Sequence, residues 1–125
     1  MKMEFDKLSN QVIGCAIEVH RTLGPGLLES TYEQCLAYEL GNAGIGFQLQ
    51  QAIPVHYKGL QLDCGYRVDV LVEGALILEL KSVDSVLAIH HAQLLTYMKL
   101  ADIKTGLLIN FNVPHLKEGI KRFVM

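Results

Sequence analysis

The feature that most constrains the fold is a pair of apolar segments, residues 66–72 and 76–83, both rich in branched side chains. Such segments favour β-strands, and the Glu-Gly-Ala stretch at 73–75 is typical of a hairpin turn. Beyond Arg67 at the start of the first segment, three charged side chains interrupt these apolar runs: Asp69, Glu79 and Lys81. An ionised group in a dry sheet is costly unless it is paired or bound to a metal. The pattern therefore predicts two central strands whose charges serve a site.

The geometry of that site depends on the length of the turn. Because side chains alternate along a strand, Glu79 and Lys81 share one face. A three-residue turn pairs position 69 with position 79, whereas a two-residue turn pairs Asp69 with Leu78 on the opposite face. The residues alone leave both registers open. With the first, two carboxylates and an ammonium converge, a set that suits a hard divalent cation and metal-assisted hydrolysis of a phosphodiester.

The first half of the chain predicts helices before strands. Apolar residues recur at three- and four-residue steps over 5–23, and Gly and Pro at 24–26 end that helix. A second helix is predicted from Leu27 to Leu40. We expect the two helices to form one layer. Residues 47–55 alternate as in a strand, and Lys58-Gly59 is typical of a turn that makes a hairpin.

The second half continues the same order. Asp84-Ser85 predicts the cap of a third helix that runs to about Ala101, and residues 105–111 predict a short apolar strand. Residues 116–125 fit no single element. The order predicts one domain, residues 1–125, of the α/β class, with a mixed central β-sheet flanked by helices.

Composition restricts the classes of function. Half of the residues are hydrophobic, but charges interrupt each apolar stretch before the roughly 18 residues that a membrane helix needs. The N-terminus shows no secretory signal, so we expect a cytoplasmic protein with no membrane partner. Three cysteines without C-x-x-C spacing argue against a disulfide framework and a structural zinc site. A net charge of −2 means that any binding of nucleic acid must come from a local site.

Three motifs resemble those of the PD-(D/E)XK nuclease superfamily. Asp69 followed by Glu-Leu-Lys at 79–81 resembles its D-(x)n-E-x-K signature, with Val68 where the signature has Pro. Residues 26–32 match the G-x-x-E-x-x-Y signature that names a family of small proteins assigned to that superfamily. Residues 93–97 resemble the Q-x-x-x-Y motif of RecB-type nucleases. The resemblance covers nearly the whole chain and implies a restriction-endonuclease-like core.

The resemblance also implies roles for single residues. Asp69, Glu79 and Lys81 would be catalytic, with Lys81 serving the attacking water. The metal, Mg²⁺ or Mn²⁺, would be bound by Asp69 and Glu79, with further contributions from the Leu80 carbonyl and from Glu29. Five residues would support the site or bind substrate: Tyr32, Arg67, His90, Gln93 and Tyr97.

The activity so implied is that of a metal-dependent nuclease acting on DNA or RNA. The main alternative is a non-catalytic regulatory module that keeps the fold and binds nucleic acid or protein. A third possibility is a hydrolase of another phosphoester, which would need a closed pocket. A homodimer would enlarge the surface that contacts nucleic acid. Taken singly, Glu79 with Lys81 could be a half-exposed surface pair, and Arg67 with Asp69 an ion pair on an edge strand.

Overall fold

The computed structural model describes residues 2–125, and its centre is a mixed β-sheet. Five strands form the sheet in the order β1-β4-β5-β6-β7: β1 (Phe47–Ala52), β4 (Arg67–Val72), β5 (Leu76–Lys81), β6 (Thr105–Asn110) and β7 (Ile120–Val124). Neighbouring strands are antiparallel except for β5 and β6, which are parallel. The chain makes the parallel pair by crossing over the sheet through a helix, as such pairs require.

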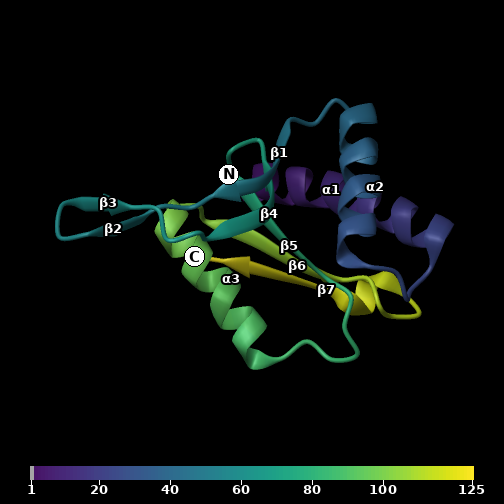
Figure 1. Cartoon of the computed structure of the whole chain (residues 1–125). Coiled ribbons are helices and arrows are strands. Elements are labelled where there is room, and N and C mark those ends of the chain that lie inside the picture. Colours follow the sequence, from purple (N-terminus) through teal and green to yellow (C-terminus); the bar gives the residue numbers. More distant parts are fainter. Residues whose placement is uncertain (1) are drawn as a thin grey trace.

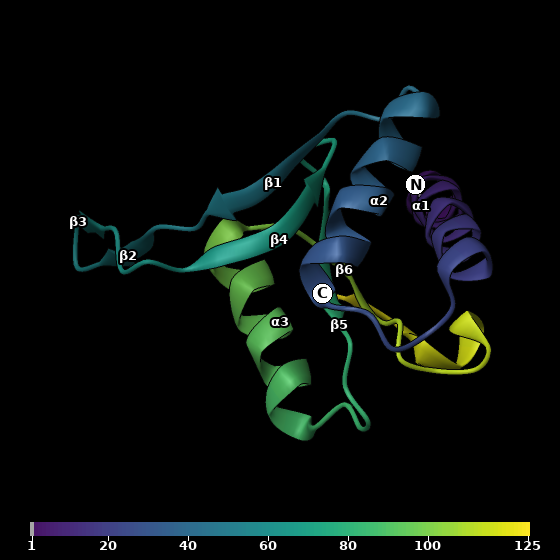
Figure 2. The same cartoon turned by 45° about the vertical axis from the view of Figure 1, so that its right-hand side comes forward.

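Helices cover both faces of the sheet. Helices α1 (Lys2–Leu23) and α2 (Glu29–Asn42) lie together on one face, and α3 (Ala88–Ala101) lies on the other (Figures 1 and 2). The buried side chains between α1, α2 and the sheet include Val12, Ala16, Val19, Leu36 and Leu40. The predicted α/β class, the mixed sheet flanked by helices and the layer formed by the first two helices are therefore confirmed. Within residues 2–125, none of the helices has the length and apolar character needed to cross a bilayer.

Helix α3 packs very closely on β6. A Cβ atom at Gly106 would lie 2.8 Å from the Met98 sulfur and 3.0 Å from Leu94 Cδ1. Leu94 and Met98 are fully buried in the core on this face, together with Ile77 and Leu108. The absence of a side chain at Gly106 thus lets α3 approach the sheet, which fixes the position of the motif residues on that helix.

The start of α3 differs from the prediction. The helix begins at Ala88, so Asp84-Ser85 does not cap it. Instead, the Asp84 carboxylate accepts a hydrogen bond from Asn112 Nδ2 at 3.2 Å. The ring of His90 supplies part of the cap, because its Nδ1 accepts the Leu87 N–H at 3.0 Å.

The remaining segments complete the fold. The predicted turn at Lys58-Gly59 is confirmed, with both residues in the left-handed region (φ 48° and 83°), but it joins a separate two-stranded arm. That arm consists of β2 (Val55–Tyr57) and β3 (Leu60–Leu62) and extends away from the main sheet (Figure 1). The ambiguous C-terminal segment forms a short 3₁₀ helix, η1 (Leu116–Gly119), followed by edge strand β7.

Candidate active site

The register of β4 and β5 places Asp69 opposite Glu79. Val72 pairs with Leu76 and Val70 with Leu78, so the turn between the strands spans residues 73–75. The Ala75 N–H closes it by donating to the Val72 carbonyl at 2.9 Å. Of the two registers that the sequence left open, the structure has the one that brings both carboxylates together.

Beyond this register the two carboxylates replace the backbone ladder. The Asp69 N–H donates to Glu79 Oε2 at 2.9 Å. In the other direction, the Leu80 N–H donates to Asp69 Oδ2 at 2.7 Å. Each acidic side chain therefore reaches across to the strand that carries the other. Both carboxylates lie in the gap where β4 and β5 separate.

Burial in this gap makes the ionised form of both carboxyls less favourable. Glu79 is only 5% exposed, and burial together with the charge of Asp69 raises the pKa of its carboxyl to about 7. Burial also raises the pKa of Asp69, although the hydrogen bond from Leu80 opposes this. The half-buried Lys81 lies close enough that its ammonium lowers the pKa of both carboxyls. Two carboxylates with one ammonium leave an excess of negative charge, which a cation would offset.

Glu29 comes to the same region from helix α2. It is the first residue of that helix, and its Oε2 accepts the Ser82 N–H at 3.3 Å, directly after the end of β5. Ser82 Oγ in turn donates to the Leu27 carbonyl at 2.6 Å. The charge of Glu29 contributes to the raised pKa of both Asp69 and Glu79. The loop before α2 and the end of β5 are thereby joined beside the carboxylates.

Tyr32 fixes the loop at residues 24–28 that leads to Glu29. Its side chain is fully buried, and its ring stacks on Phe111 with a centroid separation of 4.3 Å. The hydroxyl donates to the Gly24 carbonyl at 2.6 Å and accepts the Leu27 N–H at 3.2 Å. Gly26 lies between these two points with φ +96°, a conformation that favours glycine. In the motif at 26–32, the glycine and the tyrosine thus shape the loop, and the glutamate reaches the site.

Gln93 and Tyr97 approach from the opposite face of the sheet. The two residues share one face of α3, as predicted, and Gln93 Nε2 donates to the Tyr97 hydroxyl at 2.9 Å. Tyr97 is 6% exposed and lies tilted against Tyr66, the residue before β4, with ring centroids 6.0 Å apart. Burial raises the pKa of Tyr97, and the negative charge of Glu79 raises it further. Tyr97 therefore lies on the α3 side of the sheet, within electrostatic reach of the carboxylates.

Comparison with known families agrees with this geometry. A family model of the PD-(D/E)XK nuclease superfamily matches residues 6–123. The chain belongs to that superfamily. Its α/β architecture and the mixed sheet are those of a restriction-endonuclease-like PD-(D/E)XK fold. Searches of curated proteins and of solved structures gave no significant match.

Two of the predicted supporting residues of this PD-(D/E)XK domain make other contacts. His90 Nδ1 caps α3, as described above. Arg67 is exposed, and its ion pair is with Asp63 at 3.8 Å, so the proposed ion pair with Asp69 on an edge strand is wrong. The idea of a half-exposed surface pair at Glu79 is also wrong, because Glu79 is buried.

Sequence reasoning missed two residues next to Asp69. Gln50 Nε2 donates to Glu33 Oε1 at 2.6 Å and lies 3.4 Å from Asp69 Oδ1. Both residues line a hollow together with Asp69, and its lining consists of Glu29, Ser30, Glu33, Gln50, Asp69 and Leu80. Glu33 could have been found, because it follows Glu29 by four residues and so shares its helix face. Gln50 carries no comparable signal, since it is one of several glutamines in β1.

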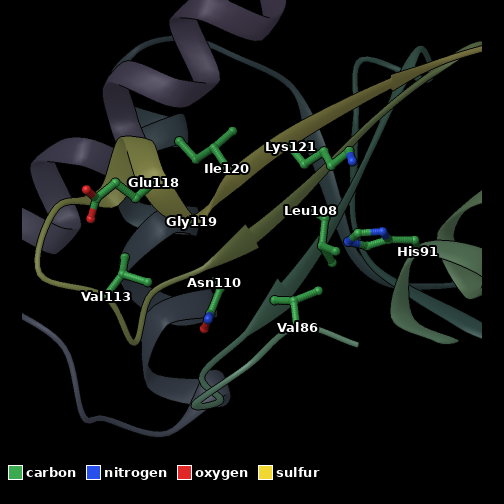
Figure 3. A pocket seen from close by; sticks show the side chains of 9 residues that line it. All are labelled: Val86, His91, Leu108, Asn110, Val113, Glu118, Gly119, Ile120 and Lys121. Atoms are coloured by element: carbon green, nitrogen blue, oxygen red, sulfur yellow. The ribbon is translucent and has the colours of Figure 1, made fainter. Parts of the chain in front are cut away.

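A second hollow lies beside β6 and β7 and does not include the two carboxylates (Figure 3). Asn110 at its centre is opposite Lys81 in the parallel pair of strands. Its side chain accepts the Val83 N–H at 3.1 Å and donates to the Val83 carbonyl at 2.9 Å. The two hydrogen bonds of Asn110 therefore hold the segment that follows Lys81, and they help to fix the end of β5.

The donors in the gap fit a hydrated divalent cation. Among residues 2–125, no three or more His, Cys, Asp or Glu side chains are grouped to hold a metal ion by themselves. Asp69 and Glu79 supply two carboxylates, and the Leu80 carbonyl belongs to the same stretch of β5. Mg²⁺ is usually bound through one or two carboxylates while it keeps several waters. The oxygen donors present suit Mg²⁺ or Mn²⁺, with water and substrate phosphate completing the shell.

Proposed function

We propose that the chain is a metal-dependent nuclease that hydrolyses phosphodiester bonds of nucleic acid. The observation that carries this proposal is the convergence of Asp69 and Glu79 in one buried gap, with Lys81 next to it. Burying two carboxylates together is unfavourable, as the raised pKa of each shows. A bound cation would reverse that cost. Membership of the PD-(D/E)XK superfamily supports the same reading.

Each residue of the gap then has a role in the hydrolysis. Asp69 and Glu79 hold Mg²⁺ or Mn²⁺, with the Leu80 carbonyl as a further ligand and Glu29 contributing from α2. When bound, the ion neutralises the charge that develops on the phosphate and lowers the pKa of a bound water. Lys81 orients the attacking water, and its ammonium faces the same developing charge.

The finer assignments belong to the same proposal. We place the chain in the G-x-x-E-x-x-Y group of the superfamily because residues 26–32 fit that signature and act together on one loop. Its 125 residues form one cytoplasmic domain, whose substrate is DNA or RNA. Tyr32, Arg67, His90, Gln93 and Tyr97 support the site or bind substrate. A homodimer would present two such sites to two strands.

A non-catalytic binding module is the second candidate. It is favoured by the hydrogen bonds that Asp69 and Glu79 accept across β4 and β5, since these bonds give both acids a structural role that needs no catalysis. Such a module would keep the fold and bind nucleic acid or protein without cleaving it.

Titration of Mn²⁺ by calorimetry separates the candidates without knowledge of the substrate. The wild type, Asp69→Asn and Glu79→Gln are compared, because an amide oxygen can still accept the backbone N–H that each carboxylate accepts. Glu118→Gln, an exposed change on η1, is the control. We expect saturable binding in the wild type and the control, and its loss in both site variants.

Cleavage is then assayed on single- and double-stranded DNA and RNA with Mg²⁺ or Mn²⁺. Cleavage by the wild type that disappears in Asp69→Asn, Glu79→Gln and Lys81→Ala supports the nuclease. Binding of Mn²⁺ or of nucleic acid without cleavage of any of the four substrates supports the module instead.

A further inference from the structure

Gln50 has an unusual backbone conformation for a residue inside a strand. The pairs Leu49↔Val70 and Gln51↔Val68 flank it, so Gln50 lies opposite Asp69. Its φ is +50°, in the left-handed region that residues with a side chain rarely adopt. Such a conformation is unfavourable for a residue with a Cβ atom, and it persists where the surrounding structure requires it. The strain is thus located directly across from a carboxylate of the candidate active site.

The side chain of Gln50 shows what the strained backbone achieves. Its Nε2 reaches two carboxylates from different elements: Glu33 of α2 at 2.6 Å and Asp69 of β4 at 3.4 Å. Asp69 is held from the other side, because its Oδ2 accepts the Leu80 N–H at 2.7 Å. The carboxylate of Asp69 is therefore oriented by one donor at each oxygen. Glu33 holds the Gln50 amide in place, and that amide is the donor next to Asp69 Oδ1.

We propose that Gln50 and Glu33 are positioning residues, which orient Asp69 for a divalent cation in the hollow that they share with it. The inference rests on the proposed metal-dependent function and adds the residues that prepare one ligand. In proteins, the groups that hold a metal-binding carboxylate or imidazole set its orientation and strongly affect metal affinity. Here the shared lining of the hollow, the two hydrogen bonds and the left-handed Gln50 carry the assignment.

The surroundings of Glu33 agree with that role. Its carboxylate is half-buried, and burial raises its pKa, as does the charge of Asp69. The hydrogen bond from Gln50 acts in the opposite direction and favours the ionised form. An amide donor between two carboxylates reduces their repulsion, which keeps both side chains directed at the same hollow.

The first test compares Gln50→Gly with Gln48→Ala, a change of another exposed glutamine in the same strand. Glycine adopts φ +50° readily, so Gln50→Gly removes the amide without straining the backbone, and the melting temperature should not fall. We expect its Mn²⁺ affinity to drop by about 10-fold, the lower end of the range for such supporting residues, and that of Gln48→Ala to stay unchanged. Wild-type affinity in Gln50→Gly, or an equal loss in Gln48→Ala, overturns the proposal.

Two variants of Glu33 separate orientation from charge. Glu33→Gln keeps a carbonyl oxygen that can accept from Gln50 Nε2, whereas Glu33→Ala removes the acceptor. Positioning predicts that Glu33→Gln binds Mn²⁺ nearly as well as the wild type and that Glu33→Ala loses as much affinity as Gln50→Gly. An equal, large loss in both Glu33 variants would mean that its charge acts directly, which overturns a positioning role.

A second measurement needs no metal. Hydrogen exchange of the Leu80 amide, which donates to Asp69 Oδ2, reports how firmly that carboxylate is held. We expect faster exchange at Leu80 in metal-free Gln50→Gly and unchanged exchange at Leu78, in the middle of the same strand. Unchanged exchange at Leu80 overturns the positioning role. If the wild type binds no Mn²⁺, the proposed metal centre fails, and this measurement still decides whether Gln50 orients Asp69.

Discussion

Asp69 and Glu79 each accept a hydrogen bond from the strand that carries the other, Asp69 from the Leu80 N–H and Glu79 from the Asp69 N–H. These two bonds extend the pairing of β4 and β5 past Val70↔Leu78, where the regular register ends. The same side chains that we propose as metal ligands therefore also satisfy backbone donors that would otherwise be unpaired in a buried gap.

Stability should depend on pH through Glu79. The folded pKa of about 7 lies above the ordinary 4.5, so the folded protein keeps a proton that the unfolded chain releases as pH rises through this range. The wild type therefore loses stability from about pH 4.5 to 7, whereas Glu79→Gln does not pay this cost. Urea unfolding in EDTA should show the variant gaining about 2–3 kcal/mol on the wild type between pH 5 and pH 8. A difference that does not change with pH, or that the exposed Glu118→Gln also shows, would contradict the raised pKa.

Divalent cations should stabilise the folded protein above pH 7. A cation that binds only the folded state at 100 times its dissociation constant adds about 2.7 kcal/mol to the free energy of unfolding. We expect Mn²⁺ to raise the melting temperature of the wild type and EDTA to restore the original value. Asp69→Asn should show neither change, and stabilisation that persists in this variant would locate the ion elsewhere.

Lys81→Ala should separate catalysis from metal binding. Removing its ammonium takes away a positive charge near Asp69 and Glu79, so Mn²⁺ affinity should be equal or tighter. The cleavage rate should fall by about 10²-fold or more, the usual contribution of a group that positions or transfers a proton. Lys117→Ala, an exposed change on η1, is the control for loss of one positive charge. An equal loss of rate in both variants would mean that Lys81 acts only through the net charge of the protein and has no specific catalytic role.

Tyr32→Phe should destabilise the loop that leads to Glu29. The change keeps the stacking on Phe111 but leaves the Leu27 N–H and the Gly24 carbonyl without the Tyr32 hydroxyl. Leu27 is exposed and Gly24 half-buried, so the expected loss is that of an ordinary intramolecular hydrogen bond, about 0.5–1.5 kcal/mol. Chemical unfolding should show such a loss, and Tyr38→Phe in the same helix, where the side chain is 67% exposed, should be neutral. Equal stabilities of the two variants would show that the hydroxyl of Tyr32 contributes nothing to the loop.

The strands and most helices could be predicted because local patterns determine them, but the register of β4 and β5 could not. Both turn lengths were compatible with Glu-Gly-Ala at 73–75. The structure holds Glu73 in a left-handed conformation (φ 53°) through contacts with Gly46. Its N–H donates to the Gly46 carbonyl at 2.9 Å, and its carboxylate accepts the Gly46 N–H. The contact between Gly46 and Glu73, which are 27 positions apart, thus favours the three-residue turn. A prediction from the residues of the turn alone cannot include this contact.

The supporting residues show the same limit. Gln93 and Tyr97 could be paired from helical spacing alone, and the structure joins them by a hydrogen bond. Gln50 could not be singled out, because its function depends on φ and on two partners that lie 17 and 19 residues away. The predicted start of α3 was wrong for a similar reason. The Asp84 side chain, which we expected to cap the helix, instead accepts a hydrogen bond from Asn112.

The crossed bonds of Asp69 and Glu79 also affect how active and inactive forms of such a domain could be told apart. A relative that no longer cleaved nucleic acid would still need both acids to complete the pairing of β4 and β5, so their retention without Lys81 would say little about activity. In the described part of the chain, Lys81 has no comparable side-chain bond to the backbone. Substitution of the lysine at position 81 would therefore be an earlier sign that catalytic activity had been lost.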